Sequence, residues 1–438
     1  MHRASSLEWW RPDIAETGVP VRIDTAAHAR GSSVPFWALM AFTAVMLISP
    51  QNYFPLFEPL RIALLTAALA GATYIWDCLV YRRPLSLRSR EVWLAASLGA
   101  WALLTVPFSY SPGGSFFFFF ELYAKSLVLF WLLASVVNSS ARLRRIFWGL
   151  SLIAIPLALT AVYNFYSGVF LDPTVKQRIA GYQGAIAGNP NDLALMLNLI
   201  LPLSVALLLI HRRLGVRLLL VATIGLSAVA IILTFSRGGF VTLATLFLLY
   251  LWKFRRRPER RWLWTLFAFL LVSIPLAGPG YLDRLATITN MEADASGSAQ
   301  QRWGDMAAAV TFMLRHPIVG SGIGQNLQAI REVRGAGGYL VHNVYLEYGV
   351  ELGILGLVLF LVLLVRCIKS AGVVQRRAEG GPGRSDLFSL AEGIQTSLIA
   401  FAVAALFYPV AYHVHFYYMA GLAVAAGAMC RPESGSWK

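Results

Sequence analysis

Charged residues are scarce in this chain of 438 residues: 13% are Asp, Glu, Lys or Arg, against roughly a quarter in an ordinary soluble domain. Cysteine is scarcer still, with Cys78, Cys367 and Cys430 alone and no CxxC spacing. These absences exclude a disulfide scaffold and a metal site built from cysteines. Hydrophobic residues instead make up 57% of the chain, which disfavours a soluble globule.

Several nucleotide, metal and hydrolase motifs are also missing. The chain has no GxxxxGK[ST] phosphate loop, no H-E-x-x-H, no GxSxG and no DxD-type carboxylate pair in the segments outside the apolar runs. The glycines of GSGIG at 320–324 do not follow a strand, which disfavours dinucleotide binding. Phosphate recognition would therefore have to come from arginines, and chemistry without a metal or a cofactor is the default expectation.

Apolar runs of membrane-spanning length recur along the chain, and together they predict an all-α polytopic membrane protein with about twelve transmembrane helices. The run after Gly239 is short, so its helix is expected to begin within the preceding Ser-Arg-Gly-Gly turn. The predicted spans lie at about 34–50, 60–80, 91–108, 116–137, 146–167, 190–210, 218–235, 238–252, 262–278, 344–366, 387–407 and 410–430.

The basic residues fix the expected orientation. With the N-terminal tail inside, 27 of the 37 Lys and Arg residues fall on the cytoplasmic side, nine fall on the other side, and Lys125 lies within a span. This bias is the positive-inside pattern, and it accounts for most of the net charge of +15 without a nucleic-acid partner. The predicted organisation is a cytoplasmic tail (1–33), nine spans (34–278), an external helical loop (279–343), three spans (344–430) and a cytoplasmic tail (431–438).

The external loop between the ninth and tenth predicted spans is too long for a structureless turn. Two apolar series at helical spacing predict two amphipathic helices lying at the membrane surface. The first series is Leu282, Leu285 and Ile288, and the second is Met306, Val310, Met313 and Leu314.

Arg237 stands in TFSRGGF, where one apolar run ends and the next begins. A guanidinium at the hydrocarbon boundary is costly unless it reaches lipid phosphates or is paired. The first interpretation is that the Arg237 side chain extends along the bilayer so that its guanidinium reaches the lipid phosphates. The second is an anion-binding arginine, because the two following glycines allow close backbone approach and the next helix supplies free N–H groups.

A cluster of basic residues on the same predicted face favours the second interpretation. Arg302 in SAQQRWGDM, with Trp303 beside it, joins Arg178, Lys176 and Arg284 on a side that is otherwise poor in basic charge. Paired arginines suit a phosphate or a diphosphate. The alternative is that these arginines simply pair with nearby aspartates, and the candidates for that pairing are Asp283, Asp294 and Asp305.

His342 stands in VHNVYLEYG, where the external loop re-enters the membrane. A histidine there can accept a proton near neutral pH, and Asn343 or Glu347 would orient or polarise it. A structural role at the start of a helix is the alternative. His316, which precedes Pro317 and a glycine-rich turn, is interpreted as structuring that loop.

Together these motifs resemble the O-antigen ligase and polymerase superfamily of polytopic membrane glycosyltransferases. His342-Asn343, followed after nine residues by Gly353 and then by Gly356, resembles the ligase signature. The other similar segments are RIAGYQGAIAGNPND at 178–192, SRGG at 236–239, SAQQRW at 298–303 and HPIVGSGIGQN at 316–326. The resemblance covers residues 178–356 in the superfamily's order, and N-terminal to it the likeness is one of hydropathy alone.

The resemblance implies a GT-C-like membrane fold in the bacterial inner membrane, with both termini in the cytoplasm and the site facing the periplasm. It implies transfer of a glycan from undecaprenyl diphosphate to the lipid A core oligosaccharide during lipopolysaccharide biosynthesis, with inversion and without a metal. Its essential histidine maps to His342, and its diphosphate-binding arginines map to Arg237 and Arg302. Arg178 is a less certain third, with Lys176, Arg284 and Asn343 as lesser candidates.

Three rival functions stay open. The nearest is an O-antigen or exopolysaccharide polymerase of the same superfamily, whose acceptor is another carrier-linked glycan. A protein O-oligosaccharyltransferase is disfavoured because eight residues follow the last predicted span. A polysaccharide-lipid transporter is disfavoured because the longest loop is external and not a central cytoplasmic one.

Overall fold

The computed structural model describes residues 32–54, 57, 60–82, 89–170, 179–182, 186–255, 257, 264, 297–378 and 385–430. Within these ranges the chain is helical, and the only β-type pairing is an isolated bridge between Phe170 and Ile179. The all-α prediction is therefore confirmed for the described residues. The C-terminal tail and the first predicted surface helix lie outside these ranges, as do nearly all of the N-terminal tail and of the predicted span at 262–278.

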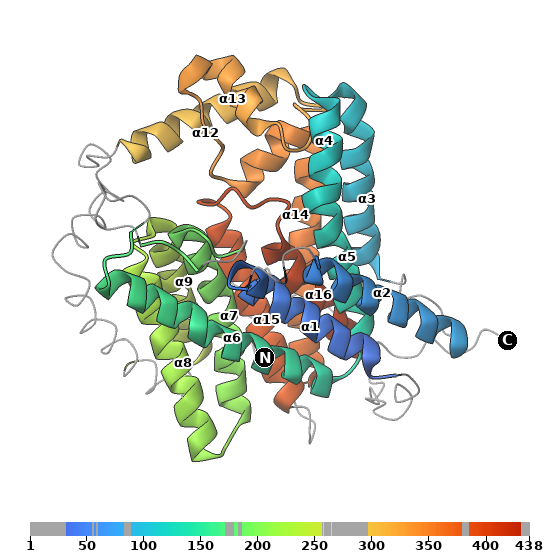
Figure 1. Ribbon diagram of the computed structural model, residues 1–438, viewed down its shortest axis with the longest axis vertical. Coiled ribbons are helices and arrows are strands. Elements are labelled where there is room, and N and C mark those ends of the chain that lie inside the picture. The colour runs from blue at the N-terminus through green and yellow to red at the C-terminus, as the bar shows by residue number, and fades with distance from the viewer. Residues whose placement is uncertain are drawn as a thin grey trace, which may run out of the picture.

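Figure 1 shows the helices as a bundle with a small cap at one end. The bundle helices are α1 (Val34–Ile48), α2 (Ile62–Val80), α3 (Arg90–Thr105), α4 (Pro112–Phe118), α5 (Ala124–Val136), α6 (Ser140–Tyr166), α7 (Pro190–Ile210), α8 (Leu214–Leu233), α9 (Arg237–Lys253), α14 (Val344–Ala378), α15 (Ser385–Ala404) and α16 (Val414–Met429). A π-helical turn at Phe119–Tyr123 joins α4 to α5. The cap consists of α12 (Ser298–Arg315) and α13 (Asn326–Arg334).

Eight helical segments among the described residues are long and apolar enough to cross a membrane. They are Ile62–Val80, Arg90–Phe108, Pro112–Val136, Ser140–Tyr166, Pro190–Ile210, Leu214–Leu233, Val344–Ala378 and Asp386–Ala404. Helices α1 and α16 are apolar but shorter. The structure thus supports a multi-pass membrane protein, while the count of twelve spans stays a prediction.

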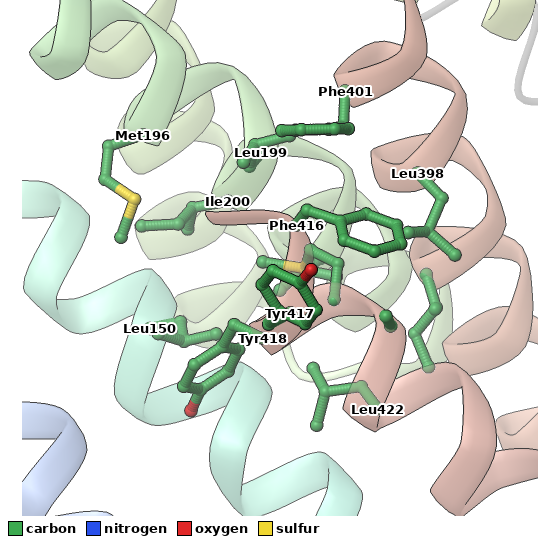
Figure 2. Close-up of a cluster of buried hydrophobic side chains, with 14 of the residues drawn as sticks. Leu150, Met196, Leu199, Ile200, Leu398, Phe401, Phe416, Tyr417, Tyr418 and Leu422 are labelled. Carbon is green, nitrogen blue, oxygen red and sulfur yellow. The ribbon is translucent and has the colours of Figure 1, made fainter. Parts of the chain in front are cut away.

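Helix α7 is the centre of the bundle. In its most apolar stretch 78% of the residues are buried, whereas the share is 11% in α2 at the periphery. Its side chains meet those of α6, α15 and α16 in the apolar cluster shown in Figure 2. The residues labelled there are Leu150, Met196, Leu199, Ile200, Leu398, Phe401, Phe416, Tyr417, Tyr418 and Leu422. The helix that will carry one edge of the candidate site is therefore fixed on several sides.

One end of the bundle is tied by ion pairs between helices. Each pair joins residues from two elements that are far apart in the sequence. They are Arg144–Asp386 (3.2 Å), Arg366–Glu91 (3.0 Å) and Arg257–Glu392 (3.0 Å). The arginines belong to clusters that the charge pattern assigns to the cytoplasm. The first turns of α7, α9, α14 and α16 lie at the opposite end, where the predicted site residues were placed.

Helix α14 is broken at Gly353, where φ is 68°. The N–H of Ile354 donates to the carbonyl oxygen of Pro317 (2.8 Å), which lies in the loop between α12 and α13. In the same loop, Ser321 N–H donates to the carbonyl oxygen of Val350 (2.9 Å). Because non-helical backbone at membrane depth must find partners within the protein, the break gives this loop a docking place on α14.

Gly353→Ala is expected to destabilise the protein more than Gly335→Ala does. Gly335 has nearly the same backbone conformation, with φ 69° and ψ −155° against φ 68° and ψ −172° at Gly353, so both alanines incur a similar backbone strain of about 1–3 kcal/mol. A Cβ at 353 would lie 2.2 Å from the carbonyl oxygen of Ile318, whereas a Cβ at 335 would meet nothing within 4 Å. Thermal unfolding of the two purified variants in detergent measures the difference. Equal melting temperatures would show that the loop does not dock tightly at the break.

Helix α12 coincides with the second predicted surface helix. Ala308, Ala309 and Phe312 pack with residues of α13 and α14 in a small separate core. Val310 and Leu314 of the apolar series are 41% and 70% exposed, as in a helix at a membrane surface. Met306 and Met313 of the same series are half-buried. Helix α13 was not predicted.

Candidate functional site at the start of helices α9 and α14

Arg237 is the first residue of α9, and three contacts fix the backbone around it. Ser236 caps the helix by accepting a hydrogen bond from Gly239 N–H (3.2 Å). A Cβ on Gly238 would lie 2.8 Å from Cβ of Phe407, and a Cβ on Gly239 would lie 2.7 Å from Cβ of Ala194. The glycines therefore let the start of α9 pack closely against α7 and the connection between α15 and α16. The prediction that this helix begins within the Ser-Arg-Gly-Gly turn is confirmed.

His342 lies just before α14, in an extended stretch that follows the cap. Its Nδ1 is 2.9 Å from the carbonyl oxygen of Leu340. A carbonyl only accepts, so this hydrogen bond requires the proton on Nδ1. In the neutral ring Nε2 then carries the lone pair, which is the arrangement that a general base needs.

The side chain of Asn343 caps α14. Its Oδ1 accepts hydrogen bonds from the N–H groups of Tyr345 (3.0 Å) and Leu346 (3.1 Å). The next residue, Val344, donates its N–H to the carbonyl oxygen of Ala405 (2.8 Å) at the end of α15. These contacts explain Asn343 as a residue that starts the helix and thereby fixes the chain beside His342.

Tyr408 contacts the start of α9 from the connection between α15 and α16. Its hydroxyl is 3.2 Å from Oγ of Ser236, the residue before Arg237. Burial is the largest cause that raises the pKa of Tyr408, the hydrogen bond with Ser236 lowers it, Asp192 raises it and Arg302 lowers it.

The connection between α15 and α16, residues 405–413, is thus the point where the predicted residues come together. Arg237 follows the serine that contacts Tyr408, the charge of Arg302 acts on Tyr408, and His342 lies two residues before the N–H that binds Ala405. Hydrogen bonds thus bring the starts of α9 and α14 to one segment. Lys176, Arg178 and Arg284 lie outside the described residues.

Two further residues of this region were not identified from the sequence. They are Tyr408, which lies within the connection, and Asp192. Asp192 lies in the first turn of α7, where Asn189 accepts hydrogen bonds from the N–H groups of Asn191 and Asp192 (2.9 Å each) and donates to the Asp192 carboxylate. The cap sequence Asn-Pro-Asn-Asp was a visible helix-start signal. No local signal marked Tyr408, because its role depends on contacts with residues more than 100 positions away.

Residues 222–361 match the family model described as O-Antigen ligase. The matched segment begins within α8, ends within α14 and includes Arg237, Arg302 and His342. The resemblance to the O-antigen ligase and polymerase superfamily is thereby confirmed over these residues. A search of curated proteins found no match.

Proposed function

We propose that the protein is an O-antigen ligase, a membrane glycosyltransferase that moves a glycan from undecaprenyl diphosphate to the lipid A core oligosaccharide. The observation that carries the proposal is that the starts of α9 and α14, beside Arg237 and His342, meet at the 405–413 connection. Both residues, and Arg302, lie within the segment similar to the O-Antigen ligase family. We further propose a GT-C-like fold in the inner membrane, with the site facing the periplasm.

The chemistry needs a clamp and a base. A hydroxyl oxygen of the acceptor attacks the anomeric carbon of the donor sugar, the bond from that carbon to the diphosphate oxygen breaks, and the hydroxyl proton passes to Nε2 of His342. The departing diphosphate keeps the bonding electrons, and Arg237 and Arg302 stabilise its growing negative charge. Attack opposite the leaving group inverts the anomeric configuration. Arginines perform the neutralisation that a metal performs in other transferases, so the proposed mechanism is metal-independent.

The location of the site suits two lipid-anchored substrates. The first turns of α7, α9 and α14 lie at one end of apolar helices, so a diphosphate there sits at the membrane boundary while its prenyl chain stays in the hydrocarbon. The guanidinium of Arg237 and the positive end of the α9 dipole favour an anion at the same place. A polymerase of the same superfamily would share this donor site and differ in its acceptor.

The experiment that tests the proposal offers the purified protein two acceptors. With labelled carrier-linked glycan and lipid A core, a ligase produces labelled lipid A core and free undecaprenyl diphosphate. A chelator leaves the rate unchanged if the clamp consists of arginines. Growth of a glycan ladder on the carrier in the absence of core would establish the polymerase instead. Movement of intact carrier glycan across a vesicle membrane, without a covalent product, would establish a transporter.

A further inference from the structure

Two buried carboxylates of α14 lie one helical turn apart below His342. Glu347 and Glu351 are 5% and 0% exposed, respectively. Neither has an ion-pair partner among the described residues. A carboxylate in the interior of a membrane bundle is costly and calls for a compensating set of contacts.

Glu351 receives three hydrogen bonds from the loop and helix that follow α12. Its Oε2 accepts from Gly324 N–H (2.7 Å), and its Oε1 accepts from both the N–H (3.0 Å) and the side-chain Nδ2 (2.7 Å) of Asn326. The carbonyl oxygen of Glu351 also accepts from Gly322 N–H (2.9 Å). This single residue therefore fixes the turn at 322–326.

Asn326 passes this restraint on to the segment that carries His342. While its Nδ2 donates to Glu351, its Oδ1 accepts a hydrogen bond from the N–H of Val341 (3.3 Å), the residue before His342. Leu340, whose carbonyl binds Nδ1 of His342, is the next residue back. A continuous path of hydrogen bonds thus runs from Glu351 through Asn326 to the backbone that orients the imidazole.

Glu347 fixes the other side of the site. Its Oε2 accepts from Ala411 N–H (3.2 Å) in the 405–413 connection, which also holds Tyr408 against Ser236. Two carboxylates one turn apart on α14 therefore hold the 322–326 turn and the 405–413 connection. Glu351 acts on the segment before His342, and Glu347 acts on the connection that contacts α9.

We propose that Glu351 is a positioning residue for His342, acting through Asn326 and Val341; the proposal rests on the function proposed above. The requirement is for a carboxylate and not merely for a polar side chain of this size. Three donors converge on two acceptor oxygens, and a glutamine would place an NH₂ group against one of those donors. Its loss would leave buried N–H groups without partners and let the His342 segment shift.

The test compares Glu351→Gln with Glu392→Gln in the full chain. Glu392 is also buried, at 3% exposed, but it pairs with Arg257 and Lys253 at the opposite end of the bundle. Glu351→Gln is expected to lower kcat about 10²-fold, the loss that a catalytic group misplaced by about 1 Å produces. The KM for the carrier-linked donor is expected to stay within about twofold, because uniform donor binding is retained. Glu392→Gln is expected to change melting temperature but neither kinetic constant.

A double variant tests the path itself. If Glu351 acts through Asn326, Glu351→Gln/Asn326→Ala is no slower than Asn326→Ala alone, since residues in one hydrogen-bond network are not additive. Losses in kcat that multiply would overturn the proposal. So would a Glu351→Gln variant whose kcat and donor KM match those of Glu392→Gln.

A readout independent of transfer separates this proposal from the proposed function. The rate of carbethoxylation of His342, followed by mass spectrometry of the His342 peptide, is expected to change in Glu351→Gln and to stay at the wild-type value in Glu392→Gln. That result supports the positioning role whether or not the wild-type protein transfers glycan. A wild-type protein that transfers no glycan would contradict the proposed function alone. Unchanged labelling of His342 in Glu351→Gln would overturn the positioning role, whether or not the wild type is active.

Discussion

His342→Ala is expected to lower the rate of glycan transfer about 10²- to 10⁴-fold, the contribution of a positioned general base. The hydrogen bond from Nδ1 to Leu340 holds the ring so that the lone pair is on Nε2, and alanine removes the proton acceptor altogether. The measurement is single-turnover transfer to lipid A core by purified variant in lipid nanodiscs. Donor binding should persist, because the arginines are unchanged.

His211→Ala is the matched control for this variant. His211 follows the C-terminal end of α7, at the opposite end of the bundle from His342, and its Nε2 accepts a hydrogen bond from the indole N–H of Trp148 (3.2 Å). Its replacement costs packing but should leave the transfer rate near the wild-type value. Equal losses in His342→Ala and His211→Ala would mean that the first loss reflects folding and not proton transfer.

Arg237→Ala and Arg302→Ala are each expected to remove about 3 kcal/mol of transition-state stabilisation, the typical cost of removing one donor to a developing negative charge. The rate should fall about 10²- to 10³-fold for each variant. Lysine at either position should restore only part of the activity, because a point charge cannot bind two phosphate oxygens as a guanidinium does. Transfer rates and donor KM values for the four single variants provide the comparison.

Arg331→Ala controls for the general charge of this end of the molecule. Arg331 lies in the last turn of α13 and is exposed, so its loss removes one positive charge without touching the 405–413 connection. Its transfer rate should match the wild type at physiological salt, where exposed charges are largely screened. A loss as large as that of Arg237→Ala would indicate electrostatic attraction of the donor by the whole surface instead of a clamp.

Hydropathy identified the helices whose side chains are mostly apolar, because these helices face lipid or the apolar core of the bundle. The start of α9 at Arg237 was predictable because an apolar run and a Ser-Arg-Gly-Gly turn coincide there, and local sequence decides a helix start. Helix α13 of the cap, with the sequence NLQAIREVR, was not predictable in the same way. It is short and polar, and its burial comes from α12 and α14, which a reading of its own sequence does not reveal.

The candidate site was predictable in its charged groups and not in its supports. An arginine or histidine in an apolar chain is conspicuous wherever it occurs, and this is why Arg237, Arg302 and His342 were identified. Gly353 was identified only as a member of the spaced-glycine signature, and Glu351 looked like an ordinary member of a helix. Their importance arises from a loop that starts more than 25 residues earlier and docks on α14, and such long-range pairing leaves no local pattern.

The central claim is that Arg237 and Arg302 bind a diphosphate beside His342, and an experimental structure with undecaprenyl diphosphate bound tests it most directly. The account predicts the diphosphate next to the 405–413 connection, with both guanidiniums within hydrogen-bond distance of its oxygens and Nε2 of His342 facing the acceptor side. A diphosphate bound at the end of the bundle where Arg257 pairs with Glu392, or one contacted by neither arginine, would contradict the account.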